Sequence, residues 1–181
     1  MAGPPLSLHD GLMRDVSELT PPLRQELIAL LPRLRRFARS LAGGDAEAGD
    51  DLAQAAIERA LANIARFEQG TRLDSWMYKI AQNLWIDSRR AQRSRGVAVP
   101  ETALEGVVGT DGRRVAEASL TLAATRRAIE ALPDDQRSAV MLVLVDGLSY
   151  KDAAEALSVP VGTVMSRIHR ARTALEARVF G

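Results

Sequence analysis

Residues 149–177 hold the pattern that most restricts how this chain can fold. Ser149 followed by Asp152 is typical of a helix start, because a hydroxyl and an acid three residues apart satisfy free N–H groups. Pro160 suits the first position of a second helix. Beyond it, apolar residues recur in steps of three and four, on one helical face: Val161, Val164, Ile168, Ala171 and Leu175. The stretch therefore predicts two short helices joined by a tight turn.

The polar residues of the second helix fall on a face turned away from this apolar stripe. They are short hydroxyl donors and forked guanidinium groups, which reach base edges and phosphates: Thr163, Ser166, Arg167 and Arg170. We therefore predict a helix-turn-helix whose second helix lies in a DNA groove. The alternative is an ordinary helical hairpin with solvated arginines. Ser158 stands at the turn position that such motifs often fill with glycine, which is a departure.

Composition favours helices over sheets, because only 4% of the 181 residues are aromatic and Ala and Leu dominate. The length allows one or two domains. The net charge of +1 hides a segregation of charge. Acidic residues gather over 45–51, and basic residues gather over 89–95 and 167–178. Local basic patches of this kind indicate nucleic-acid binding.

Several classes of protein are disfavoured by what the sequence lacks. It has no cysteine, and its two histidines, His9 and His169, lack ligand spacing, so we expect no metal and no cofactor. No apolar run approaches the ~20 residues of a membrane span, and the start lacks a signal-peptide pattern. A soluble cytoplasmic protein is therefore expected. No acid–base pair, nucleophile set or phosphate-binding glycine loop suggests an enzyme.

The N-terminal half predicts three helices after a mobile arm at residues 1–20. The first opens at Pro21 and Pro22 and ends at Gly43 and Gly44. The expected bounds of the others are Asp45 or Asp50 to about Phe67 for the second, and Asp74 or Ser75 to about residue 95 for the third.

The third helix has a mostly polar exterior that becomes basic towards its end. Its outward residues are Lys79, Gln82, Asn83, Ile86, Arg89, Arg90 and Arg93. Tyr78 and Trp85 add aromatic surface beside them. Aromatic rings, amides and cations together fit unpaired bases. The alternative is a solvated helix end whose cations suit the helix dipole.

Residues 96–115 break the helical period with glycines and a proline, and predict a flexible linker. Helices resume over residues 116–132 and again from Asp134 to Gly147. The run 139–145 alone could be a strand, but its place between a helix start and a glycine stop favours a buried helix. We therefore predict an all-α chain with helical domains at 21–95 and 116–181.

Four segments, taken in order, resemble the extracytoplasmic-function (group 4) sigma factors of bacterial RNA polymerase. They are DDLAQAAIERAL, FEQGTRLDSWMYKIAQNLWIDSRR, LPDDQRSAVMLVLVDGLSYKDAAEALSVPVGTV and SRIHRAR. ERALANIARFEQGTRLDSW resembles the alphaproteobacterial general-stress branch. The resemblance implies a sigma2-like domain over 21–95 and a sigma4-like domain over 116–181. It implies promoter-specific initiation with core RNA polymerase for a stress regulon, an anti-sigma factor as partner, and a monomer when free.

The resemblance also implies roles for individual residues. Docking on core polymerase falls to Asp51, Gln54 and Glu58. Contacts with single-stranded minus-ten DNA, including a flipped base at the loop 67–73, fall to Phe67, Gly70, Thr71, Arg72, Lys79, Gln82, Asn83, Ile86, Arg89 and Arg90. Contacts with the minus-thirty-five duplex fall to Lys151, Thr163, Ser166, Arg167, His169 and Arg170. Family members often place a basic residue where Met165 stands here.

Two other classes stay open at this point. A stand-alone helix-turn-helix regulator would bind duplex DNA without polymerase, but it leaves the basic, aromatic helix at 76–95 unexplained. A helical protein-interaction module would show no salt-sensitive DNA affinity, whereas phosphate contacts make affinity fall steeply with salt.

Overall fold

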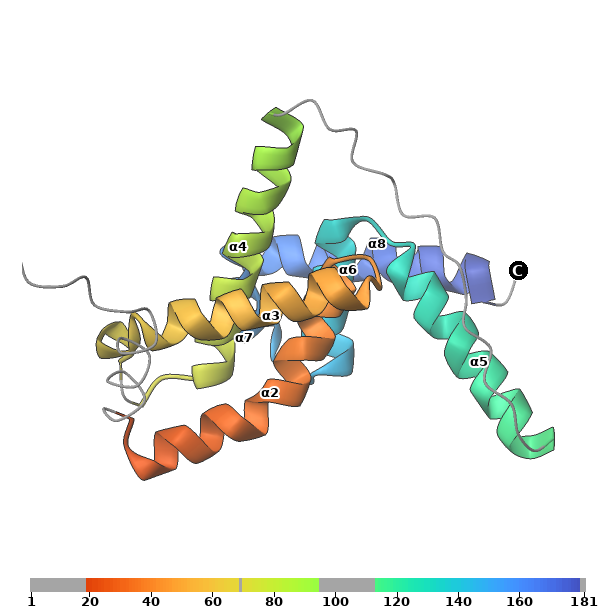
Figure 1. Cartoon of the computed structure of the whole chain (residues 1–181). Helices are drawn as coiled ribbons and strands as arrows, with labels where there is room; N and C mark the ends of the chain where they lie inside the picture. The colour runs from red at the N-terminus through yellow and green to blue at the C-terminus, as the bar shows by residue number, and fades with distance from the viewer. Residues whose placement is uncertain (1–18, 69, 95–112, 180–181) are drawn as a thin grey trace, which may run out of the picture.

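The computed structural model describes residues 19–68, 70–94 and 113–179, and every regular element within these ranges is helical (Figure 1). The all-α prediction is confirmed. Most of the predicted arm at 1–20 and of the predicted linker at 96–115 lies outside the described residues.

The first helical unit consists of α2 (Pro21–Leu41), α3 (Ala46–Leu61) and α4 (Leu73–Ser94). The prolines open α2 as predicted, and the Asp45 carboxylate caps α3 by accepting the Ala48 N–H at 3.1 Å. Two predicted bounds were wrong. The second helix ends at Leu61, and a short 3-10 turn, η1 (Ile64–Arg66), follows it. The third begins ahead of both predicted caps, because the Arg72 carbonyl already accepts the Trp76 N–H at 3.2 Å.

The core of the first unit joins large side chains of α2 and α4 to small residues of α3. The Phe37 and Tyr78 rings meet edge to face with their centroids 5.0 Å apart, and both side chains are fully buried. Ala56 and Ala60 line the buried face of α3. Small residues let helices approach closely, so α3 lies directly against its neighbours. Its polar face is left at the surface.

The second unit consists of α5 (Arg113–Glu130), α6 (Asp134–Val140), the π turn η2 (Met141–Val145), α7 (Tyr150–Leu157) and α8 (Val161–Val179). Helix α5 begins three residues inside the predicted linker. The run 139–145 is helical as predicted, but its last five residues form the π turn, and Leu144 and Val145 are exposed.

The two units pack against each other, a placement that the predicted flexible linker left open. Helix α4 lies along α7, and α2 lies against α6 and η2 (Figure 1). One buried apolar cluster includes residues of both units, for example Leu34 and Met77 in the first and Leu142 and Leu157 in the second. In this structure the two units therefore share part of their buried core.

Gly49 offers a test of the close packing between α2 and α3. A Cβ at this buried position would lie 2.4 Å from the Arg39 Cα, which is backbone and cannot move aside. We expect Gly49→Ala to lower the free energy of unfolding by about 1–3 kcal/mol, as overpacking does. Denaturant titration measures this.

Gly162→Ala is the matched control, because a Cβ there meets nothing within 4 Å. Alanine is the better helix former, so this change should raise stability by up to about 1 kcal/mol. Equal stabilisation by both substitutions would contradict the close approach at Gly49.

Candidate nucleic-acid interfaces

The turn between α7 and α8 has the geometry predicted for a helix-turn-helix. The Ser149 hydroxyl accepts the Asp152 N–H at 3.1 Å and donates to the Asp152 carboxylate at 2.7 Å, which confirms the capping pair. Ser158 ends α7 in the left-handed region with φ 54°. Helix α8 begins at Val161, so Pro160 precedes its first residue and does not occupy it.

Helix α8 is anchored by the predicted apolar stripe. Val164, Ile168 and Ala171 are buried, whereas Val161 at the start of the stripe is partly exposed. The opposite side of α8 leaves Ser166, His169, Arg170 and Thr173 at the surface. The Arg170 Nε donates to the Ser166 carbonyl at 3.3 Å, within its own helix. A helix fixed along one side therefore presents short donors and a guanidinium group on the other.

Two residues of α8, Arg167 and Met165, differ from a fully exposed basic surface. The Arg167 side chain is only 19% exposed, and its Nε lies 3.1 Å from a carboxylate oxygen of Asp135 on α6. Its contact with DNA would have to coexist with this ion pair. Met165 is 51% exposed, and a thymine methyl group is the base feature that suits such an apolar side chain. Lys151 is exposed on α7, beside this helix.

The surface predicted for single-stranded DNA is partly open and partly covered. Lys79, Asn83 and Arg90 on α4 are exposed, whereas Gln82, Ile86 and Arg89 are half-buried. The Arg89 guanidinium lies 5.4 Å from the centroid of the Trp85 ring, in a cation–π arrangement.

The loop before α4 is held by its own contacts. Phe67 packs on Trp76, with ring centroids 5.2 Å apart. The Thr71 hydroxyl donates to the Glu68 carbonyl at 2.6 Å, and Gly70 has φ +91°, a conformation that side chains disfavour. These contacts hold Phe67 and Thr71 beside the start of α4.

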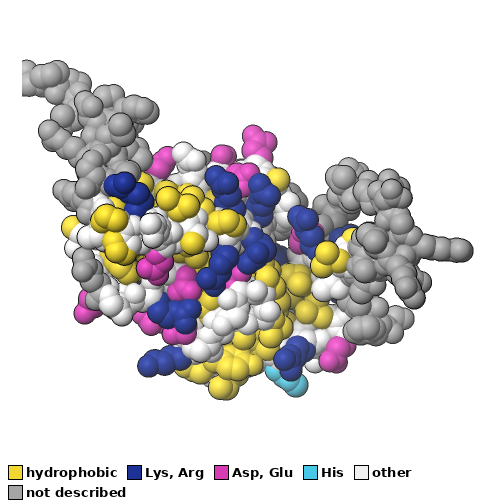
Figure 2. Space-filling view, turned by 90° about the horizontal axis from the view of Figure 1, so that it is seen from below, with side chains coloured by type: hydrophobic (Ala, Val, Ile, Leu, Met, Phe, Trp, Pro, Cys, Tyr) yellow, Lys and Arg dark blue, Asp and Glu magenta, His cyan; other side chains and the backbone are white. Residues whose placement is uncertain are grey.

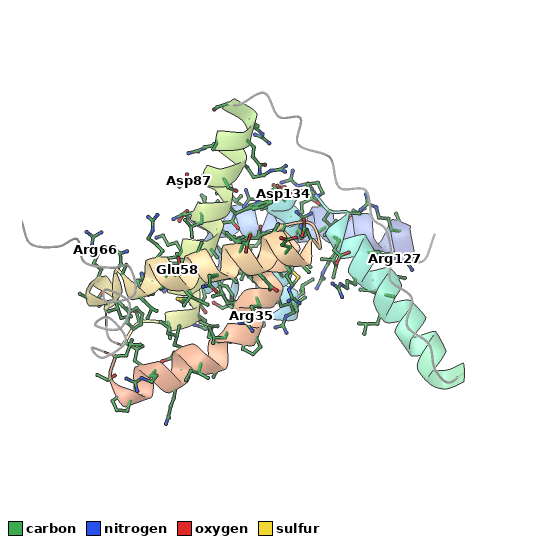
Figure 3. The ribbon with its side chains drawn as sticks, in the orientation of Figure 1. Arg35, Glu58, Arg66, Asp87, Arg127 and Asp134 are labelled. Carbon is green, nitrogen blue, oxygen red and sulfur yellow. The ribbon has the colours of Figure 1, made fainter. Side chains whose placement is uncertain are left out.

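The residues predicted to dock on core polymerase share one exposed face of α3. Asp51, Gln54 and Glu58 are all at the surface, and Figure 3 labels Glu58 on α3. The Gln54 amide donates to the Glu58 carboxylate at 3.2 Å. Behind this face, Arg39 of α2 forms two hydrogen bonds with Asp50, at 2.9 and 2.7 Å. These bonds lower the pKa of the Asp50 carboxyl and raise that of the guanidinium.

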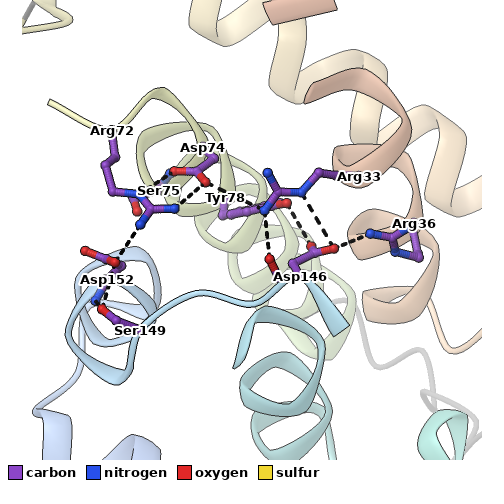
Figure 4. Close-up of polar contacts among 9 residues, drawn as sticks. All are labelled: Arg33, Arg36, Arg72, Asp74, Ser75, Tyr78, Asp146, Ser149 and Asp152. Carbon is purple, nitrogen blue, oxygen red and sulfur yellow. Dashed lines mark hydrogen bonds and ion pairs between the residues drawn. The ribbon is translucent and has the colours of Figure 1, made fainter. Parts of the chain in front are cut away.

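We call the contact between the two units, where α2 and α4 meet α6, η2 and α7, the seam. It holds polar contacts that the sequence did not predict. Asp146 lies just after η2, among the residues drawn in Figure 4, and its side chain is fully buried. Its carboxylate accepts hydrogen bonds from Arg36 and, at 2.8 Å, from the Tyr78 hydroxyl, and the Asp146 carbonyl accepts from Arg33 at 3.0 Å. Burial and the neighbouring carboxylate raise the pKa of Tyr78, so this phenol stays protonated and donates.

Arg72 crosses the seam at a second place. It donates to Asp74 at 2.7 Å and to Asp152 of α7 at 2.8 Å (Figure 4). Burial acts to raise the pKa of Asp74, but the hydrogen bonds from Arg72 and the Ser75 N–H outweigh it and the pKa is lowered. Asp74 therefore remains charged beside the loop.

Further polar contacts complete the seam. Arg137, which is 2% exposed, donates to the Leu41 carbonyl of α2 at 3.1 Å and to two carbonyls of its own unit. Arg89 lies 3.6 Å from Asp134. Basic side chains gather across the middle of one face of the molecule, with acidic ones beside them (Figure 2). No local pattern could have indicated these pairs, because the partners are far apart in the chain.

Comparisons with known proteins agree with this two-unit architecture. The family description Sigma2 domain of PhyR matches residues 27–82, and Sigma-70, region 4 matches residues 122–175. The sigma factor EcfG of Rhodopseudomonas palustris is 38% identical over 162 residues, which cover 90% of this chain and 87% of that protein. SigW of Bacillus subtilis is 35% identical over 151 residues, covering 75% and 78% of the two chains.

A solved structure is similar over both units. The sigma factor RpoE of Bartonella quintana, crystallised with the anti-sigma factor NepR, matches with a TM-score of 0.71 and 31% identity. The match covers 89% of this chain and 98% of that one.

The fold and the matched regions define a two-domain initiation factor of the sigma-70 class. The chain belongs to the extracytoplasmic-function family of RNA polymerase sigma factors, proteins that bind core polymerase and direct transcription from promoters. The PhyR, EcfG and RpoE matches support the general-stress branch that the sequence indicated. The two rival interpretations are not favoured, because neither accounts for a sigma2 domain at residues 27–82.

Within the described ranges, no helix is long and apolar enough to cross a membrane, and no group of three or more His, Asp or Glu side chains could hold a metal ion.

Ser158 offers a test of the turn. An L-residue in the left-handed region costs roughly 1 kcal/mol that glycine does not. Ser158→Gly should therefore raise the free energy of unfolding by about 0.5–1 kcal/mol. Ser166→Gly, at an exposed position inside α8, should lower it by a similar amount. A loss of stability with Ser158→Gly in denaturant titration would contradict the strained turn.

Proposed function

We propose that this sigma factor contacts promoter DNA through two separate surfaces. The exposed side of α8 reads the duplex minus-thirty-five element, with Lys151 of α7 near the phosphates. The loop 67–73 and the outer side of α4 hold the melted non-template strand of the minus-ten element. In this assignment the sigma2-like domain spans 21–95, the linker 96–115, and the sigma4-like domain 116–181.

The observation that carries the proposal is the two-sided character of α8. Val164 and Ile168 are buried, while Ser166 and Arg170 are exposed on the other side of the same helix. Hydroxyl groups bond either base edges or phosphates, and guanidinium groups pair with guanine or phosphate. A rigid helix that presents both is suited to a DNA groove.

The outer side of α4 supports the second surface. Lys79 and Arg90 offer cations to phosphates, and Asn83 offers both a donor and an acceptor to a base. The partly exposed Trp85 provides an aromatic face. Extruding a base costs a few kcal/mol of stacking, and donors combined with a stacking surface can offset that cost.

The proposed partners follow from the family and from one relative. The Bartonella quintana RpoE was solved with the anti-sigma factor NepR. By analogy, we propose that an anti-sigma factor covers both units of this chain until a stress signal removes it. The protein acts in the cytoplasm and performs no chemistry of its own, because the polymerase supplies the catalytic site.

Arg170 is the cleanest test of the minus-thirty-five surface, since Arg167 is already paired with Asp135. In holoenzyme assembled with core polymerase, Arg170→Ala should weaken binding to a promoter duplex by about 1–3 kcal/mol, the cost of one base-directed arginine. Fluorescence anisotropy at fixed salt measures this.

Arg172→Ala is the matched control. Arg172 is also exposed, and its substitution removes the same charge, but it lies two residues on, about 200° round the helix. Arg172→Ala should weaken binding to the promoter duplex less than Arg170→Ala does, because it removes only a long-range charge interaction. Equal losses from both variants would contradict a specific α8 surface.

The α3 surface is tested by Asp51→Lys combined with Gln54→Ala. Charge reversal and amide loss on an exposed docking face should reduce affinity for core polymerase roughly tenfold, or about 1.4 kcal/mol. Competition with labelled wild type for core enzyme measures this. Glu176→Lys, an exposed reversal on α8, should bind normally. Normal competition by the α3 double variant would refute the docking role.

A further inference from the structure

The seam between the units crosses the surface proposed for the minus-ten strand. Three of the residues proposed to contact that strand are engaged by the second unit: Arg72, Gln82 and Arg89. Their partners lie on α6 and α7, at 2.8, 3.3 and 3.6 Å respectively. In this arrangement, the second unit occupies part of the face that DNA would use.

The groups of the second unit that engage these arginines are carboxylates, which carry negative charge as the phosphates of a DNA strand do. Arg72 meets the carboxylate of Asp152, and Arg89 meets that of Asp134. A strand would offer phosphate oxygens to the same cations. The carboxylates of the second unit and the phosphates of a strand therefore compete for the same cations.

Beside the shared apolar cluster and the contacts of Arg72 and Arg137, a buried carboxylate joins the two units. We define the Asp146 clamp as the Asp146 carboxylate with Arg33 and Arg36 of α2 and Tyr78 of α4. Among the described residues, the side chains that form hydrogen bonds or ion pairs with this carboxylate come from the first unit. The π turn directs Asp146 there, because the Asp146 N–H bonds to the Met141 carbonyl five residues back at 2.9 Å.

We propose that the free chain adopts a closed state in which the Asp146 clamp holds the second unit over the strand-binding face of α4. The sigma factor then binds minus-ten DNA only after its units separate. This rests on the proposed function of α4. The second unit then competes with the strand for the same face of α4. The fewer chains are open, the lower is the apparent affinity for the strand.

Closure is tested by distance measurements that do not involve DNA. The chain has no cysteine, so Ala62→Cys on the first unit and Ala177→Cys on the second accept spin labels at exposed sites. Double electron–electron resonance should give one narrow distance distribution for the otherwise unchanged full chain. A broad distribution would overturn the closed state.

Two clamp variants test what holds the units together. Asp146→Ala removes the shared acceptor, and Arg36→Glu places a second carboxylate against it. Both should shift the distribution to longer, broader distances, with helicity by circular dichroism unchanged. Arg36 is half-exposed, so its variant should fold even if Asp146→Ala does not. Arg35→Glu reverses an adjacent exposed charge that acts on Asp50 within the first unit, and this variant should stay closed.

Masking is tested with a fluorescent single-stranded minus-ten oligonucleotide. Arg36→Glu should bind it at least about fivefold more tightly than Arg35→Glu does, despite carrying the same net charge. Equal affinities together with an open Arg36→Glu chain would overturn the masking. Binding by no variant, open or closed, would instead refute α4 as the strand surface, and the distances would still decide whether the chain closes.

Discussion

A buried carboxylate lies where the two helical units of this sigma factor meet. Asp146 belongs to the second unit, and the groups that donate to its side chain belong to α2 and α4. Burying a charge is unfavourable unless it is paired and hydrogen-bonded. The apolar cluster shared by the units supplies the driving force for contact. The clamp restricts that contact to the arrangement in which the charge is satisfied.

Helices α3 and α8, which carry two of the proposed contact surfaces, are each held by the side opposite to that surface. Helix α8 buries its apolar stripe, and α3 buries its small residues, so their polar sides are fixed at the surface. Helix α4 is different, because it packs on α2 and α3 and also lies along α7. Its polar side is therefore shared between solvent and the second unit. The same cations serve as seam contacts and as proposed DNA contacts.

Local signals predicted the helices well. Caps and breakers act within a few residues, so Ser149, Asp45 and Pro21 marked helix starts that the structure confirms. The errors were also local: a helix began ahead of Asp74, and the π turn had no signal in an all-apolar run. Helical periodicity likewise predicted which side of α8 is exposed. The DNA and polymerase contacts of individual residues remain predictions.

The sequence was sufficient for the helix order, the polar sides of α3 and α8, and the family, since each depends on neighbours along the chain. Only the tertiary structure shows which arginines pair with carboxylates of the other unit. Arg36 and Asp146 are 110 residues apart, and Arg72 and Asp152 are 80 apart, so no spacing rule connects them. Whether an arginine faces water, a phosphate or a carboxylate depends on what packs beside it. In this protein, that neighbour is the other half of the same chain.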